Sequence, residues 1–475
     1  MKRQNYNKQQ TLNELILKYE DMSQKEAVVF YEEAVFLDIV NYYQNTKKIE
    51  SALSAVETAL AQHNYSAGLY YKKAELLSLY SHNPLFLKDA LAAIEKAESL
   101  SPQTLGIKLL KSQLFGWKGA FEEAFEVIHE IRTFLPVSST QELSDTYYCE
   151  GLLYERQQDY ESMFEVWKEA LLLNPRHEDV FSRIRLCVEF SDKYKESIEL
   201  FNYLIDQDPY SHLAWFHLGL AKSIVGEREE ALEAFEFAYI IDKTFKWAYK
   251  ERGEILLDSK KYAEALDCYL EALDHIMPDG DLLYHIGLCY QYQGNIDAAI
   301  DLFQKAADID PYNDEVYFSM GECMSALEKW SNAIPYFKQA IGLDNRREEY
   351  YAALGSVYYK LEKYDRAYQC FDKAAVLAPE QTTIWVQFAS FLFNVGYYEE
   401  ALEILDDGER HAVGEELSYC KVACLYKVGK DKEAISVLAN ALTEDYDKHE
   451  LLFKYVPELV DNSTYSSVIK YYKEC

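Results

Sequence analysis

Apolar and polar residues alternate along this chain with the spacing of amphipathic helices. Between residues 280 and 313, apolar side chains three or four positions apart, from Leu283 to Tyr290, fall on one face of a helix. A Gly-Asn turn follows, and the same spacing returns from Ala299 until Pro311, which cannot continue a helix. This stretch therefore predicts two consecutive helices joined by a tight turn.

The two-helix pattern recurs at a constant period and keeps small and bulky residues in register. The evenly spaced glycine column comprises Gly219, Gly253, Gly287, Gly321 and Gly355, with Gly151 two periods earlier. Later in each unit come an alanine column (Ala231, Ala265, Ala299, Ala333, Ala367), an aromatic column (Phe235, Tyr269, Phe303, Phe337, Phe371) and a second alanine column (Ala238, Ala272, Ala306, Ala340, Ala374). Antiparallel helices approach closely only where one presents a small side chain, so a bulky residue of the partner helix should fill the adjacent gap.

A period of about 34 residues with this pattern resembles the tetratricopeptide repeat family. The family signature is a bulky aromatic residue, a Leu-Gly pair, Tyr, Ala, Phe, Ala and a closing Pro. One unit carries it as Tyr351, Leu354, Gly355, Tyr358, Ala367, Phe371, Ala374 and Pro379, and another as Trp215, Leu218, Gly219, Ala231, Phe235 and Ala238. The resemblance implies an all-α, right-handed superhelical solenoid of antiparallel helix pairs.

Extending this register predicts about twelve units over most of the chain. They are 33–66, 67–104, 105–143, 144–177, 178–211, 212–245, 246–279, 280–313, 314–347, 348–381, 382–414 and 415–448. We expect four regions: an N-terminal helical segment (1–32), divergent units (33–143), regular units (144–448) and C-terminal capping helices (449–475). Four extra residues near Ser81–Pro84 enlarge the second unit, and the small insertion Ser139–Leu143 would form a joint.

The charge of the chain restricts its partners. The 475 residues include 48 Lys and Arg against 80 Asp and Glu, a formal net charge of −32. Such a surface repels phosphate backbones and anionic lipid, so we expect no nucleic-acid or membrane partner. Solubility explains the charge most simply, and a preference for basic partners is the other interpretation. Without a secretory signal or an 18-residue apolar stretch, the sequence favours a cytoplasmic protein.

Nine cysteines raise the question of a metal site or a disulfide. Cys187, Cys289, Cys323 and Cys424 share one column, Cys149 and Cys420 a second, and Cys268 and Cys370 a third, leaving Cys475 outside. Residues at one repeat phase are spaced for packing and not for meeting one another, so we expect neither a metal nor a disulfide. Phosphate-binding glycine loops, His-Glu-x-x-His and Gly-x-Ser-x-Gly are all missing, which predicts no catalytic residue, no cofactor and no enzyme.

The first helices of the units carry the candidate partner-binding residues. In tetratricopeptide-like arrays these helices line the concave face, and their inner positions here repeat aromatic–leucine pairs one turn apart. The candidates are Tyr148, Leu152, Leu186, Phe216, Leu220, Tyr284, Leu288, Tyr292 and Phe318. Around them lie Asp145, Glu155, Asp179, Glu189, Asp281, Glu315 and Glu322. An apolar floor with an acidic rim predicts a groove for a protein or peptide, and a basic-aliphatic segment would fit it.

Several alternatives stay open beside the groove. The aromatic residues could serve only to pack the inner face, and the chain's own start, Leu12–Tyr19, could occupy the groove. The chain could also be a structural subunit that self-associates through its end units, 33–66 or 415–448. Chaperone adaptors of this family hold a C-terminal carboxylate with Lys and Asn residues, whereas the inner positions here offer only Lys250, which faces Glu254. We therefore expect no chaperone-tail partner.

Overall fold

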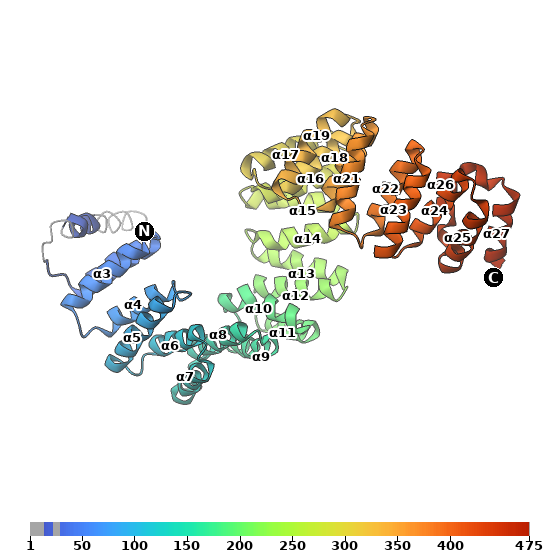
Figure 1. Ribbon diagram of the computed structural model, residues 1–475. Helices are drawn as coiled ribbons and strands as arrows, with labels where there is room; N and C mark the ends of the chain where they lie inside the picture. The colour runs from blue at the N-terminus through green and yellow to red at the C-terminus, as the bar shows by residue number, and fades with distance from the viewer. Residues whose placement is uncertain (1–13, 22–28, 475) are drawn as a thin grey trace. The chain divides into compact units, whose positions relative to one another are not determined.

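The computed structural model describes residues 14–21 and 29–474, and their regular secondary structure is helical throughout. The chain divides into two compact units, Met1–Ala248 and Tyr249–Cys475. The boundary falls within helix α14, Lys246–Asp258. From α2 to α25 the described helices number 24 and follow one another as twelve pairs (Figure 1). The expected all-α solenoid of about twelve helix pairs is thereby confirmed.

The unit Met1–Ala248 contains the helix pairs drawn from blue to green in Figure 1. They are α2 Glu33–Asn45, α3 Ile49–Gln62, α4 Ala67–Ser78, α5 Pro84–Leu100, α6 Leu105–Lys118, α7 Phe121–Phe134, α8 Thr140–Gln157, α9 Tyr160–Leu173, α10 Glu178–Ser191, α11 Tyr194–Gln207, α12 His212–Ile224 and α13 Arg228–Ile241. The insertion Ser139–Leu143 does not form a loop, because α8 begins at Thr140 and the inserted residues make its first turn.

The unit Tyr249–Cys475 continues with α15 Tyr262–His275, α16 Gly280–Tyr292, α17 Ile296–Ile309, α18 Asp314–Ala326, α19 Trp330–Leu343, α20 Glu348–Lys360, α21 Tyr364–Leu377, α22 Thr382–Val395, α23 Tyr398–His411, α24 Glu415–Val428 and α25 Asp431–Glu444. Two short 3-10 helices, η1 Tyr446–His449 and η2 Pro457–Val460, alternate with α26 Glu450–Tyr455 and α27 Ser463–Glu474. Leu452, Leu459 and Tyr465 of this last segment are buried in one cluster with residues of α24 and α25.

The glycine and aromatic columns explain why the helices pair. A Cβ atom built on Gly287 would lie 2.5 Å from Cε1 of Phe303, and one on Gly321 would lie 2.6 Å from Cε1 of Phe337. The same ring-on-glycine contact joins Gly219 to Phe235 in the other unit, at 2.7 Å. The aromatic rings are fully buried. The predicted close approach at the small columns is therefore confirmed, and the bulky residue that fills the gap is the aromatic ring of the second helix in the same pair.

The turn inside each pair also requires particular backbone geometry. Gly226 and Gly294 end their first helices with φ of 88° and 82°, in the left-handed region that glycine adopts without steric cost. Glu328 and Glu362 hold the corresponding position in later pairs with φ of 56° and 57°. The turn geometry is therefore kept even where the sequence lacks the glycine, because packing of the two helices outweighs the local strain.

The N-terminal segment packs on the first helix pair. Residues 14–21 are helical, and Ile16 and Tyr19 are buried in one cluster with residues of α2 and α3. The hydroxyl of Tyr43 donates a hydrogen bond to Oε1 of Glu20 at 3.0 Å. Leu12, the first residue of the segment that we considered as an occupant of the groove, lies outside the described residues. The described part covers α2 and α3, which contradicts the idea that it fills a groove on α8, α10 and α12.

Candidate protein-binding face

All nine predicted partner-binding residues lie on first helices of pairs. Within Met1–Ala248 they come from α8, α10 and α12, and within Tyr249–Cys475 from α16 and α18. First helices of successive pairs contact each other directly, as α10 and α12 do in one unit and α16 and α18 in the other. We call the surface that these helices share within each unit the first-helix face.

In the unit Met1–Ala248 the predicted aromatic residues bury part of their surface against neighbouring side chains. The half-buried ring of Tyr148 stacks on Trp167 with 6.0 Å between centroids. Phe216 packs against Phe235 at 5.7 Å and against Phe245 at 5.0 Å. Leu152 and Leu186 are half-buried, and Leu220 is only 7% exposed. These side chains therefore stabilise contacts between helices, and only part of their apolar surface remains open.

The unit Tyr249–Cys475 shows the same arrangement with one clear exception. Tyr284 packs against Phe303 at 5.8 Å, and Phe318 against Tyr350 at 4.7 Å, while Leu288 is half-buried. Burial and the nearby carboxylate of Glu315 raise the pKa of Tyr284, so it stays a neutral phenol. Tyr292 is 52% exposed and stacks on Tyr262 at 5.0 Å. Among the nine candidates, Tyr292 is the side chain most available to a partner.

Two exposed apolar residues at the same repeat position escaped the sequence analysis. Phe190 lies three periods before Tyr292 in the sequence, and Ile224 lies two periods before it. Phe190 is 65% exposed and stacks on Tyr160 at 4.7 Å, as Tyr292 does on Tyr262. Ile224 is 48% exposed. The repeat phase is the sequence signal for this column at the C-terminal ends of first helices, and the pattern of aromatic–leucine pairs does not include it.

The first-helix face near Leu220 holds a hollow of only about 20 Å³. Val188, Phe201 and Ile224 are among its lining residues, with Leu220. A volume of this size accommodates about one water molecule and not a side chain. A partner at this place would therefore lie across the helices, in contact with their exposed side chains, and would not insert into a deep pocket.

The acidic residues around the face are largely paired with basic residues. Arg183 donates two hydrogen bonds to Glu155, at 3.0 and 3.1 Å, and the guanidinium of Arg185 pairs with Glu189. Lys250 pairs with Asp281 at 2.9 Å in the other unit. Several of these partners, Lys250 and Asp281 for example, stand about one repeat apart in the sequence. The rim is thus less negative than the count of its carboxylates suggests.

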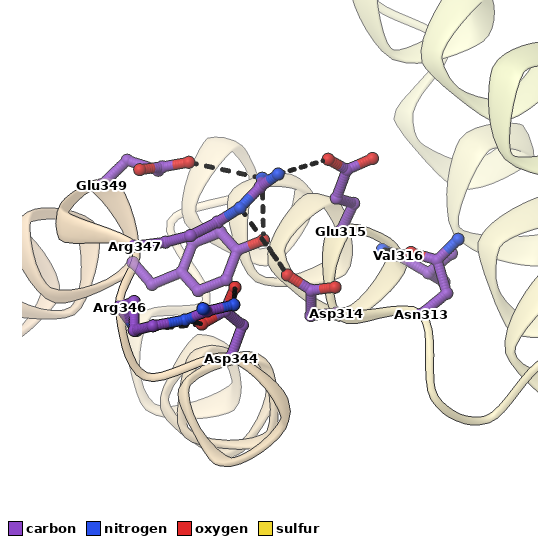
Figure 2. A network of polar contacts seen from close by, with 9 residues as sticks. Asn313, Asp314, Glu315, Val316, Asp344, Arg346, Arg347 and Glu349 are labelled. Atoms are coloured by element: carbon purple, nitrogen blue, oxygen red, sulfur yellow. Dashed lines mark hydrogen bonds and ion pairs between the residues drawn. The ribbon is translucent and has the colours of Figure 1, made fainter. Parts of the chain in front are cut away.

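Arg347 is the centre of the most extensive of these networks (Figure 2). Its guanidinium donates to Oε1 of Glu315 at 2.9 Å and to the hydroxyl of Tyr350 at 3.2 Å. Tyr350 in turn donates to Oδ2 of Asp314 at 2.6 Å. The network joins the start of α18 to the start of α20, so it fixes two first helices against each other.

Two buried histidines at one repeat phase have opposite electrostatic environments. His217 packs against the rings of Phe181 and Phe201, and burial lowers its pKa to about 3. His285, two periods later, is also buried, which lowers its pKa, but Glu254 and Asp281 outweigh that effect and raise it. Its Nε2 lies 3.4 Å from Oε1 of Glu254, and its Nδ1 lies 2.8 Å from the carbonyl oxygen of Asp281. Burial favours the neutral form of Glu322, as it does for His217, and therefore raises the pKa of its carboxyl group.

The cysteine side chains in the described part of the chain are free thiols. Burial raises the pKa of Cys187, Cys289 and Cys323 to about 12, so they are poor nucleophiles and poor metal ligands at neutral pH. Within α24 the neighbouring thiol of Cys420 and burial raise the pKa of Cys424. Across residues 14–21 and 29–474, no cluster of three or more His, Cys, Asp or Glu side chains has the geometry to hold a metal ion. Cys475 lies outside the described residues.

Comparison with known protein families accounts for the repeats. The tetratricopeptide repeat model matches residues 244–311 and 279–346, in the register of the helix pairs from α14 to α19. The model for subunit 3 of the anaphase-promoting complex, or cyclosome, matches residues 330–408. The chain is a tetratricopeptide repeat protein. At that general level it is a protein-interaction scaffold, and repeats of this family are typically non-catalytic.

Curated relatives match the tetratricopeptide array over limited stretches. Anaphase-promoting complex subunit 3 of Schizosaccharomyces pombe is 28% identical over 168 residues, which are 34% of this chain and 24% of the relative. The Hordeum vulgare protein named "Probable UDP-N-acetylglucosamine--peptide N-acetylglucosaminyltransferase SPINDLY" is 26% identical over 129 residues, 26% of this chain and 14% of that protein. The aligned part of the chain thus spans a quarter or less of each relative's length.

Among solved structures, the tetratricopeptide array is similar to yeast Tom70. The sequence identity is 16%, the match covers 93% of this chain and 96% of Tom70, and the TM-score is 0.42. No described helix of the array has both the length and the apolar composition needed to cross a membrane.

Proposed function

We propose that the protein is an adaptor that binds an extended or helical segment of a partner protein along its first-helix faces. The exposed apolar column at the ends of first helices carries this proposal. Phe190 and Ile224 stand on the adjacent helices α10 and α12, and Leu186 and Phe216 are half-buried on the same two helices. Exposed apolar side chains at one repeat position on neighbouring helices suit a segment that crosses them.

Apolar contact would supply most of the affinity at this face. Removing apolar surface from water contributes roughly 25 cal/mol per Å², from which the cost of ordering the partner is subtracted. The net charge of −32 would speed the approach of a basic-aliphatic segment. The ion pairs at Glu155 and Glu189 make the electrostatic potential near them less negative. The likeness of residues 330–408 to a subunit of the anaphase-promoting complex supports an adaptor that works within a multiprotein assembly.

The test compares capture of partners by variants with different exposed side chains. Partners are captured from the native cell with the full chain and identified by mass spectrometry. Phe190→Ala with Ile224→Ala removes the exposed column of one unit, whereas Tyr203→Ala removes a 49% exposed aromatic ring from the second helix α11. We expect the double variant to capture at least tenfold less partner than the unchanged chain. Tyr203→Ala should capture as much partner as the unchanged chain. Equal capture by both variants would show that the first-helix face of this unit does not bind.

A second pair of variants tests the unit Tyr249–Cys475 in the same way. Tyr292→Ala removes the exposed candidate on α16, and Tyr312→Ala removes an 81% exposed tyrosine from the turn before α18. Weaker capture by Tyr292→Ala alone would support binding at this face. If capture depends instead on the end units 33–66 or 415–448, and the chain elutes as an oligomer, self-association through those units replaces the proposal.

A further inference from the structure

The residues inserted in the second repeat help to line a surface hollow. Helix α5 has 17 residues against 14 in α3 and α7, and it begins at Pro84. The side chain of Asn83 caps it by accepting a hydrogen bond from the backbone N–H of Leu85 at 3.0 Å. Ser81 and Pro84, both from the insertion, line a hollow of about 720 Å³ between α5 and the end of α6.

The floor of this hollow is apolar. Leu87 and Leu91, one helical turn apart on α5, face it together with Trp117 from α6. The indole of Trp117 is 42% exposed. The guanidinium carbon of Arg156 lies 3.4 Å from the centroid of that ring, a cation–π contact that holds the indole in place. A rigid, half-exposed indole beside two leucines is a suitable anchor for one apolar side chain of a partner.

The rim of the hollow is basic, in contrast to the rest of the chain. Lys88 and Lys118 line it and are exposed, and neither has an ion-pair partner among the described residues. Arg156, stacked on the indole, also has no ion-pair partner there. By contrast, Lys108 and Lys111 on the same helix α6 pair with Glu130 and Glu98, at 2.8 and 2.7 Å. Glu95 is the single acidic residue that lines the hollow.

We propose that this hollow binds an acidic-apolar segment of a partner protein. One aliphatic or aromatic side chain would pack against Leu87, Leu91 and Trp117, and flanking Asp or Glu side chains would pair with Lys88 and Lys118. A volume of about 720 Å³ accommodates one large side chain with its neighbours. The site differs from the exposed column of the first-helix face, because most of its lining residues come from α5, the second helix of its pair, and it selects the opposite partner charge.

The binding experiment uses an array of octapeptides as the probe. Each peptide carries one Leu, Ile, Phe or Trp beside two Asp residues in a Gly-Ser background, and each has a counterpart in which Lys replaces Asp. The array is incubated with the labelled full chain in 0.15 M salt, where charges within about 8 Å still interact. We expect acidic-apolar peptides to be retained and their Lys counterparts not to be. Retention of the Lys counterparts, or of no peptide at all, would overturn the proposal.

Variants then locate the binding surface. Trp117→Ala removes the anchor, and Lys118→Glu reverses a charge of the rim without touching the buried core. Lys96→Glu makes the same charge change on the exposed surface of α5 at a residue that does not line the hollow. We expect the affinity for the best peptide to fall at least tenfold in Trp117→Ala and Lys118→Glu and less than twofold in Lys96→Glu, with circular dichroism unchanged. Equal affinities for all three variants would refute the assignment, because the peptide would then bind elsewhere.

Discussion

Adding a single methyl group to different glycines should change stability in an order that the structure sets. A Cβ atom on Gly287 would meet Phe303 at 2.5 Å, whereas one on Gly355 would meet Phe371 at 3.1 Å and one on Gly342 would meet nothing within 4 Å. Overpacking costs about 1–3 kcal/mol, and replacing glycine by alanine inside a helix contributes up to about 1 kcal/mol. We therefore expect Gly342→Ala to stabilise, Gly355→Ala to change little, and Gly287→Ala to destabilise by about 1–2 kcal/mol.

Hydrogen exchange followed by mass spectrometry is the suitable assay for this series. Stability in a repeat array is nearly a sum of local terms, and a single midpoint does not describe it well. Gly287→Ala should reduce amide protection in α16 and α17 and leave the helix pair α24 and α25 unchanged. Equal protection changes for all three glycine variants would refute the packing argument, because they would show that the aromatic ring does not fill the gap beside the glycine.

A double-mutant cycle measures the contact between Gly287 and Phe303 directly. Phe303→Leu replaces the ring by a smaller side chain, so the added methyl group of Gly287→Ala should cost less in that background. We expect a favourable coupling free energy of about 1 kcal/mol between the two changes. Strict additivity would show that the two residues do not meet.

Three further predictions concern side-chain chemistry. Arg347→Ala should destabilise the contact between α18 and α20 by about 1 kcal/mol at low salt and by less in 0.5 M NaCl, as measured by hydrogen exchange of these two helices. The raised pKa of His285 means that its protonation stabilises the fold fully below about pH 6.5 and that this contribution is lost as pH rises through the folded-state value. His217, with its pKa lowered to about 3, should cost stability as pH falls below about 6.5, and NMR of ring-labelled histidines should show the two opposite titrations. Cys187 and Cys289, with pKa values raised to about 12, should resist iodoacetamide at pH 8 until urea unfolds the chain, which peptide mass spectrometry can follow.

The contacts within a helix pair were predictable because they join residues close in sequence. The ring of Phe303 lies on Gly287 of the preceding helix, and the short turn between the two helices leaves them little freedom. A periodic column of glycine and one of aromatic residues therefore indicated the contact directly. Which aromatic residue meets which glycine depends on the periodicity of the two helices, and that periodicity can be seen in the sequence.

Contacts between helix pairs were harder to predict, because they depend on how two pairs pack. Arg347 pairs with Asp314 and Glu315 of the preceding helix pair as well as with Glu349 of its own (Figure 2). Glu315 was therefore predicted to be part of an acidic rim, and its basic partner Arg347 was not predicted. Opposite charges spaced by about one repeat were the available signal.

The exposure of the candidate face was the least predictable property. Leu220 and Tyr292 both occupy first helices, yet one is 7% exposed and the other 52%. The difference follows from their repeat positions, because Leu220 stands one residue and Tyr292 five residues after the glycine column, and a pattern of aromatic–leucine pairs does not separate these two positions. For the same reason Phe190 was not among the predicted partner-binding residues. Its exposure follows from its place at the end of α10.

We propose that partner proteins bind across the first-helix faces. The most direct test is hydrogen exchange of the full chain with and without its captured partner, read helix by helix. We expect slower exchange on binding in first helices, either in α10 and α12 with Phe190 and Ile224 or in α16 with Tyr292. Slower exchange confined to second helices such as α11 and α13, with the first helices unchanged, would contradict it.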